Sequence, residues 1–240
     1  MPKKTNEDKL EVRKLCENDL EAFINWVQPR RCLGDIHKRV IKWWTRDEAL
    51  SHQLLLLPRD HMKSALIAFR AAWALTRDPT LRILYISSTS NLAIKQLKFI
   101  KDIITCDAYR TLWPEMVEKE EAKREKWTER EISIDHPKRK EWAVRDPSIF
   151  TAGLTTNIVG MHCDIAVLDD VVVQTNAYTK LGREKVMEQY GHLSSVEGSN
   201  AKEWIVGTRY DDDDLYGNLI GRMIQTFDER GKVTSETPLF

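Results

Sequence analysis

The chain has 240 residues, of which 37 are basic and 37 acidic, so its formal net charge at neutral pH is zero. This balance excludes a generally basic nucleic-acid-binding protein but leaves room for a local basic patch. A hydrophobic fraction of 42% and a mean hydropathy of −0.47 are typical of a globular protein with one large α/β domain or two small ones, and no apolar run is long enough to cross a membrane.

The four cysteines are scattered along the chain and form no C-x-x-C pair. This spacing predicts neither a zinc site nor a disulfide framework, and it favours reduced thiols in a cytosol-like compartment. Residues 1–9 lack the features of a signal peptide, and no membrane partner is expected. The cysteines are Cys16, Cys32, Cys106 and Cys163.

Residues 1–50 are predicted to be a helical segment packed on the core. An approximate helical stripe runs through Leu10, Val12, Leu15, Leu20, Phe23, Ile24 and Val27. A second helix is expected within residues 29–44, with Asp35 as its N-cap. A helix in this position can line a nucleotide base pocket, so Asp35 and His37 are candidates for adenine contacts. A cap and a surface residue are the favoured interpretation of both.

The stretch from residue 54 to residue 75 carries the first chemical motif. Four leucines at 54–57 suit a strand buried on both faces, and residues 65–75 contain neither Gly nor Pro and read as a helix. Between them lies a polar turn that ends in Lys63-Ser64. In a phosphate-binding loop with this layout the lysine reaches the β/γ oxygens and the serine hydroxyl holds Mg²⁺. The expected contacts are Pro58, Arg59, Asp60, His61, Met62, Lys63 and Ser64.

This loop lacks the two glycines of the usual G-x-x-x-x-G-K-[ST] pattern. Leu57 takes the place of the first glycine and Met62 that of the second. Those glycines serve tight backbone bends that a residue with a Cβ resists. The alternative interpretation of Lys63-Ser64 is therefore a solvated helix start.

A second strand is predicted at residues 81–89 and a helix at residues 91–105. The repeated strand–helix order predicts an α/β fold with a parallel sheet and right-handed crossovers.

Residues 115–141 mix many charges of both signs and are expected on the surface. Within them Lys138, Arg139 and Lys140 are either contacts to DNA phosphates or charges at a hairpin tip, and the hairpin is favoured. Short strands are expected at residues 142–145 and 148–153.

In residues 164–170 an apolar strand runs into two carboxylates. At such a strand tip the first acid, Asp169, would hold the Mg²⁺ shell, and Asp170 would orient or deprotonate an attacking water. The alternative is that both carboxylates cap the next turn.

A polar helix is expected at residues 179–194, followed by a strand at 202–210 that should lie beside the Asp169 strand. Thr208 and Arg209 at its end would then sense the γ-phosphate, or else form an ordinary exposed strand end. The acids of residues 211–214 are interpreted as a helix N-terminus rather than a metal site.

Three stretches, at residues 58–64, 160–170 and 207–217, stand in an order that resembles the ATPase domain of the large terminase subunit, the DNA-packaging motor of tailed bacteriophages. The resemblance covers roughly residues 30–225. The run Gly207-Thr-Arg-Tyr with Asp214-Leu-Tyr-Gly217 is its most specific part.

The resemblance implies an additional-strand, RecA-like P-loop ATPase fold with a central, mostly parallel sheet flanked by helices. It implies ATP and Mg²⁺ as ligands and double-stranded DNA as the translocated substrate. The implied partners are the portal protein, the small terminase subunit and further copies of the chain in a ring. The implied location is the host cell cytoplasm.

Carried over by position, Lys63 and Ser64 bind the phosphates and Mg²⁺, and Arg59 acts on the γ-phosphate. Asp169 is the metal acid and Asp170 the catalytic carboxylate, while Thr208 belongs to the coupling motif.

The chain departs from the family pattern at two of these places. The catalytic carboxylate is commonly Glu, and Asp170 is one methylene shorter. Some relatives carry an arginine just before the glycine at Gly160 that reaches a neighbouring subunit. Val159 stands there in this chain, which leaves Arg139 or Arg145 as guesses for that role.

The expected organisation is a P-loop ATPase core at residues 51–225 and a tail at residues 226–240. Large terminases usually continue into a nuclease domain, so the chain is interpreted as a fragment without DNA cleavage. Two alternatives remain. One is a degenerate P-loop module that binds DNA or a partner protein without hydrolysis, and the other is a helicase-type ATPase.

Overall fold

The computed structural model describes residues 6–46, 50–158, 160–227 and 233–240. Within these ranges six strands form one sheet in the order β1-β6-β5-β2-β4-β3, and only the edge pair β3–β4 is antiparallel. The prediction of an α/β fold with a central, mostly parallel sheet is confirmed. The strands are β1 (His52–Leu56), β2 (Ile83–Ser87), β3 (Glu131–Ile132), β4 (Ile149–Gly153), β5 (Cys163–Asp169) and β6 (Glu197–Gly207).

Two separate hydrophobic cores cover the two faces of this sheet. On β2, Ile83 and Tyr85 belong to one core, whereas Leu84 and Ile86 belong to the other. This alternation follows from the pleat, and it explains why the central strands read as continuous apolar runs. The first core packs under α4 (Lys63–Arg77) and α5 (Ser90–Thr105), and the second under α8 (Gln174–Ala177), α9 (Lys180–Gly191) and α10 (Leu215–Ile220).

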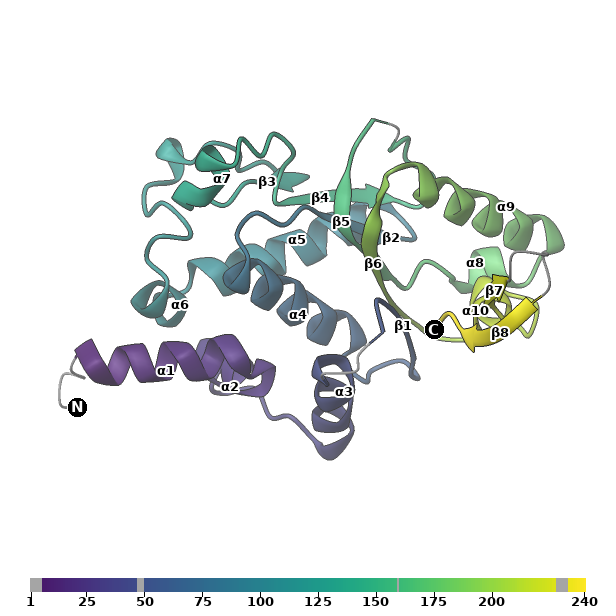
Figure 1. Ribbon diagram of the computed structural model, residues 1–240, viewed down its shortest axis with the longest axis horizontal. Helices are drawn as coiled ribbons and strands as arrows, with labels where there is room; N and C mark the ends of the chain where they lie inside the picture. The colour runs from purple at the N-terminus through teal and green to yellow at the C-terminus, as the bar shows by residue number, and fades with distance from the viewer. Residues whose placement is uncertain (1–5, 47–49, 159, 228–232) are drawn as a thin grey trace.

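The N-terminal helices extend the first core. They are α1 (Asn6–Asn18), α2 (Leu20–Val27) and α3 (Asp35–Thr45), and α6 (Asp107–Leu112) packs against α1 and α2 (Figure 1). The stripe predicted across residues 1–28 is interrupted because Asp19 caps α2, its Oδ1 accepting from the Ala22 amide at 3.0 Å. As a result Leu10 and Leu15 are exposed, in contrast to the prediction.

The N-cap of the second predicted helix lies one position earlier than expected. Gly34 is the N-cap of α3, and Asp35 is its first helical residue. His37 turns back along the helix, and its Nδ1 accepts from the Gly34 amide at 3.0 Å. The prediction that Asp35 is the N-cap is wrong, and its side chain is exposed at the first helical position, whereas His37 contacts the cap residue.

The charged segment before β4 folds differently from the prediction. The hairpin tip expected at residues 138–140 is the short helix α7 (Pro137–Glu141). Residues 142–145 form no strand, because α7 ends there and Ala143 adopts a positive φ of 49°. In α7 Lys138 and Lys140 are exposed and Arg139 is buried.

The C-terminal residues are more ordered than the predicted tail at 226–240. β7 (Met223–Phe227) and β8 (Val233–Pro238) pair as an antiparallel two-stranded sheet. This hairpin and α1 lie at opposite ends of the long axis of the molecule (Figure 1).

The site is positioned by β6, which lies between β1 and β5. The sequence predicted that β6 would lie beside the strand that ends in Asp169. Val206 of β6 is opposite Leu55 of β1 on one side and Asp169 of β5 on the other. The carboxyl ends of the three strands are therefore level. The loops that leave them lie side by side, which is where ligands bind in parallel sheets.

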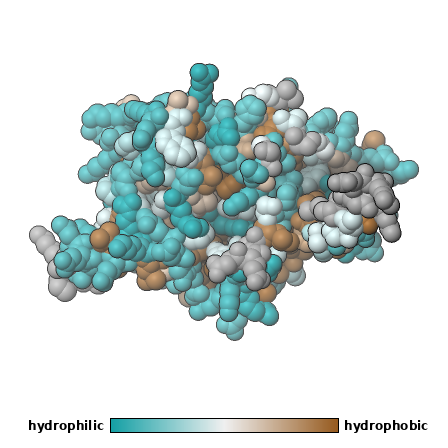
Figure 2. Space-filling view, viewed as in Figure 1, coloured by the Kyte–Doolittle hydropathy of each residue, from teal (hydrophilic) through white to brown (hydrophobic). Residues whose placement is uncertain are grey.

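Among the described residues no helix combines the length and the apolar character that a membrane span requires. The face shown in Figure 2 is largely hydrophilic, with hydrophobic residues scattered over it.

The aromatic contact between the N-terminal helices and the core supplies a test of their packing. Phe23 is fully buried, with its ring centroid 6.3 Å from that of Tyr109 and 5.7 Å from that of Trp113. Phe23→Ala is expected to lower the free energy of unfolding by about 3–5 kcal/mol. The exposed control Leu10→Ala should change it by less than about 0.5 kcal/mol. Urea denaturation measures both, and equal effects would contradict this packing.

Candidate active site

The loop between β1 and α4 has a backbone that glycine would adopt more easily. Asp60 has a φ of 63° and Met62 a φ of 54°, both in the left-handed region that residues with a Cβ rarely occupy. Met62 stands where the phosphate-loop pattern has its second glycine, so the bend is present although the glycine is not. Two bonds hold the loop to the end of β6: the Leu57 amide donates to Gly207 O at 3.1 Å, and Thr208 Oγ1 donates to Leu57 O at 3.0 Å.

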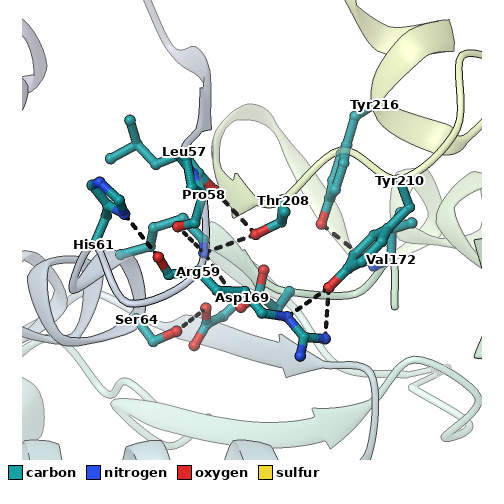
Figure 3. Close-up of polar contacts among 12 residues, drawn as sticks. Leu57, Pro58, Arg59, His61, Ser64, Asp169, Val172, Thr208, Tyr210 and Tyr216 are labelled. Carbon is teal, nitrogen blue, oxygen red and sulfur yellow. Dashed lines mark hydrogen bonds and ion pairs between the residues drawn. The ribbon is translucent and has the colours of Figure 1, made fainter. Parts of the chain in front are cut away.

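Lys63 is the first residue of α4, and its side chain is only 5% exposed. Its ammonium group donates to Thr208 Oγ1 at 3.0 Å and to Pro58 O at 3.3 Å (Figure 3). It also lies 3.8 Å from Asp170 Oδ2. The ammonium group thus joins the P-loop to the ends of β6 and β5, and phosphate oxygens would have to take over some of these contacts.

Ser64 and Asp169 form a second contact across the ends of the strands. Ser64 Oγ donates to Asp169 Oδ1 at 2.7 Å (Figure 3), and Tyr85 OH donates to Oδ2 at 2.9 Å. Burial raises the pKa of Asp169 from 3.8 to about 6, although these two hydrogen bonds act against the shift. A hydroxyl beside a buried carboxylate is a donor set that suits Mg²⁺, because a divalent cation prefers oxygen ligands and offsets the buried negative charge.

Asp170 follows directly and has a positive φ of 47°. Its amide donates to Val206 O at 2.9 Å, which holds this strained residue against β6. Burial raises the pKa of its carboxyl group, and the charges of Lys63 and Arg59 act in the opposite direction. The side chain is still 37% exposed, so it borders solvent where Asp169 does not.

Arg59 lies in the loop with its guanidinium group held by Tyr210. Nε and Nη2 of Arg59 donate to Tyr210 OH at 2.9 and 2.7 Å, and the same group lies 5.7 Å from the centre of the ring (Figure 3). The ring of Tyr210 also makes an edge-to-face contact with the ring of Tyr178. Arg59 is therefore attached to the segment after β6.

The remaining loop and strand-end residues have local roles. His61 Nδ1 lies 2.8 Å from Arg59 O, within the loop (Figure 3). Arg209 is partly exposed and pairs with Asp212 at 2.8 Å, so only Thr208 of the predicted coupling pair reaches the loop. Asp214 caps α10 by accepting from the Gly217 amide, in agreement with the predicted helix N-terminus.

The two arginines suggested for a neighbouring subunit differ in their surroundings. Arg139 is 5% exposed and donates to the carbonyl oxygens of Pro79, Leu81 and Asp146, so it cannot reach out of the chain, and the guess that it does is wrong. Arg145 is exposed. Val159 lies outside the described residues.

Sequence reasoning missed three tyrosines that shape the site. Tyr85 holds Asp169, Tyr210 holds Arg59, and Tyr216 covers Gly207 so closely that a Cβ there would lie 2.3 Å from its ring. The Val172 amide donates to Tyr216 OH at 3.4 Å (Figure 3). The sequence contained one indication of Tyr85, a hydroxyl group in an otherwise apolar strand. Tyr210 and Tyr216 lie in the run that carries the resemblance most specifically, but their contacts depend on loop paths that periodicity does not predict.

Comparisons with known proteins support the resemblance to the large terminase subunit. No protein-family model matches the chain. The chain is 28% identical over 205 residues to the large terminase subunit of Enterobacteria phage T3, covering 78% of this chain and 30% of that protein. Among solved structures, the large terminase of bacteriophage HK97 superposes with a TM-score of 0.57 at 15% identity, covering 85% of this chain and 40% of that one. A large terminase ATPase domain of Thermus phage P74-26 aligns with a TM-score of 0.49 at 11% identity over 82% of this chain and 72% of that one.

The chain therefore spans less than half the length of the T3 and HK97 proteins that it matches. The similarity to the HK97 structure shows the shared fold of the domain.

The buried carboxyl group of Asp169 predicts a pH dependence of stability. Its pKa is higher in the folded chain than in the unfolded one, so ionisation of this group destabilises the fold as pH rises from about 4 through about 6. The shift corresponds to at most about 3 kcal/mol at neutral pH.

Asp169→Asn is therefore expected to raise the free energy of unfolding at pH 7.5 by about 1–3 kcal/mol without added metal, and by less at pH 4.5. Denaturation of both proteins at the two pH values checks this. A variant that is less stable than the parent at pH 7.5 would contradict the predicted cost of the buried charge.

Proposed function

We propose that the chain is the ATPase motor domain of a viral DNA-packaging terminase, which hydrolyses ATP with Mg²⁺ to translocate double-stranded DNA into a procapsid. The single observation that carries this proposal is the contact of Lys63 with Thr208 and Asp170 beside the contact of Ser64 with Asp169. Five side chains, from the start of α4 and from the ends of β5 and β6, come together there, and phosphoryl transfer requires such a set. The likeness to the T3 and HK97 proteins supports the same conclusion.

In this proposal the backbone of residues 58–62 and the N-terminus of α4 receive the phosphates, which helix N-termini favour. Lys63 leaves Thr208 to contact phosphate oxygens, and Ser64 and Asp169 would hold Mg²⁺. Bound Mg²⁺ would supply charge neutralisation at those oxygens.

Asp170 orients the attacking water and accepts its proton. Its raised pKa and its border with solvent suit a carboxylate in this role. Once the guanidinium group of Arg59 has left Tyr210, that group offsets negative charge at the γ-phosphate. Thr208 transmits the movement of Lys63 to β6, because its hydroxyl group accepts a hydrogen bond from Lys63 and donates one to Leu57 O of the loop.

We place the domain in the host cell cytoplasm, with the portal protein and the small terminase subunit as partners and with further copies in a ring. The domain boundaries at residues 51 and 225, and the absence of nuclease activity from this chain, belong to the same proposal. A degenerate module is the second candidate, and the glycine-free loop with its strained Met62 favours it. No observation favours a helicase-type ATPase.

Removal of the Lys63 ammonium group is the first test. Lys63→Ala should abolish saturable binding of a non-hydrolysable Mg-ATP analogue in calorimetry, and turnover with it, because no other described cation lies between Pro58, Thr208 and Asp170. The exposed Lys98→Ala is the matched control and should bind as the parent does. Normal turnover by Lys63→Ala would refute the proposal, and saturable binding without turnover in the assembled motor would favour the degenerate module.

The hydroxyl group of Tyr210 provides a second test. Tyr210→Phe keeps the ring beneath Arg59 but removes the acceptor of both hydrogen bonds. Arg59 is then freer to move to phosphate, so the analogue should bind about threefold more tightly. Tyr178→Phe, whose ring only contacts that of Tyr210, is the control and should bind as the parent does. Weaker binding by Tyr210→Phe would show that Tyr210 positions Arg59 rather than withholding it.

A further inference from the structure

Two adjoining cavities lie at the amino-terminal ends of the parallel strands, at the edge of the sheet opposite the P-loop. The first, of about 650 Å³, is lined by the ends of α3 and α4, by the beginning of β5 and by residues 200–204 in the middle of β6. The second, of about 550 Å³, is lined by residues 142–146. The two share Asp78, Leu81 and Asp164, so they form one groove, here called the amino-edge groove.

The amino-edge groove is basic although the chain as a whole is neutral. Among the described residues, six cationic and three acidic side chains line it. Two of the acids are already neutralised, because Arg82 pairs with Asp164 at 2.7 Å and with Asp146 at 3.4 Å. The third, Asp78, accepts from the amide and hydroxyl of Thr80.

Four exposed cations of the groove have no carboxylate partner among the described residues. Two are held in place by aromatic rings: the guanidinium group of Arg77 lies 4.5 Å from the ring centre of Trp73, and that of Arg46 lies 5.7 Å from that of Trp43. Such stacking leaves the N–H groups free to bind an anion. The four cations are Arg46, Arg77, Arg145 and Lys202.

A fifth cation, Arg70, lies deeper in the groove and is 5% exposed. Its guanidinium group lies between two rings, 4.9 Å from the centre of Trp44 and 3.7 Å from that of Trp204. Nη2 donates to Gln53 Oε1 and to Trp44 O, whereas Nη1 has no partner among the described residues. A buried charge is normally paired, so this permanent positive charge favours an anion in the groove above it.

We propose that the amino-edge groove binds the phosphate backbone of double-stranded DNA. Closely spaced phosphates suit several unpaired cations that share one groove, and guanidinium groups bind phosphate with two N–H donors. A single strand would need exposed aromatic rings on which bases stack, but Trp44, Trp73 and Trp204 are at most 7% exposed and lie against arginines. Trp142, 68% exposed at the rim, is the one ring of this lining that can touch the nucleic acid.

This inference rests on the proposed function in taking DNA as the substrate, but it does not need the nucleotide site. It places DNA at the edge of the sheet opposite the phosphate-binding loop. DNA affinity and nucleotide affinity can therefore be lost independently.

The test is fluorescence anisotropy with a labelled 20-base-pair duplex and no nucleotide, over a range of salt concentrations. The triple variant Arg77→Glu, Arg145→Glu, Lys202→Glu should bind at least tenfold more weakly, and the slope of log affinity against log salt should fall by about 3, one phosphate for each cation. The control Lys14→Glu, Lys95→Glu, Lys98→Glu changes charge equally at exposed positions on α1 and α5 and should bind within about twofold of the parent. Thermal denaturation checks that both variants fold.

Two further measurements separate this proposal from the others. The groove variant should retain the affinity of the parent for the Mg-ATP analogue, and Lys63→Ala should retain the affinity of the parent for the duplex. Equal losses in the groove and control variants, or no duplex binding by the parent at low salt, would overturn the inference. Displacement of the duplex by polyglutamate at equal charge concentration would also overturn it, in favour of an acidic protein partner. Duplex binding by a parent chain that binds no Mg-ATP analogue would count against the proposed function and not against this inference.

Discussion

The ammonium group of Lys63 is the constraint on which the carboxyl end of the sheet depends. It is buried, and its contacts come from the loop after β1, the residue after β6 and the residue after β5. A buried cation must be satisfied by its surroundings, so these three segments cannot separate without exposing or orphaning it. The position of β6 between β1 and β5 places the partners on both sides of one ammonium group. The same arrangement makes the charge available to a ligand that offers better acceptors.

Much of this arrangement was predictable from the sequence, because it follows from short apolar runs that end in polar groups. The leucines of β1 and the run before Asp169 had the length and composition of buried strands, and parallel strands place their carboxyl ends at one edge. That Lys63, Ser64, Asp169 and Thr208 meet there follows from this rule alone. The strained φ of Met62 also follows, since the loop must bend where other phosphate loops have glycine.

What the sequence could not predict depends on contacts between distant segments. Arg139 stands between two lysines in a charged stretch, which favours exposure, yet it donates to carbonyl groups of two other segments, residues 79–81 and Asp146. The pairing of β7 with β8 was missed because residues 226–240 are polar. The backbone hydrogen bonds that join the two strands leave no pattern in the types of side chain. The partnership of Arg59 with Tyr210 joins residues 151 positions apart.

Residues 203–206 of β6 are paired with a parallel neighbour on each side, β1 and β5. A strand held in two ladders is stiff, because sliding it would break hydrogen bonds on both edges at once. Lys202 and Thr208 flank this doubly paired stretch, and roughly 20 Å of extended chain separates them. A displacement of Thr208 would therefore have to be carried by the stretch as a unit, with Lys202 at its other end.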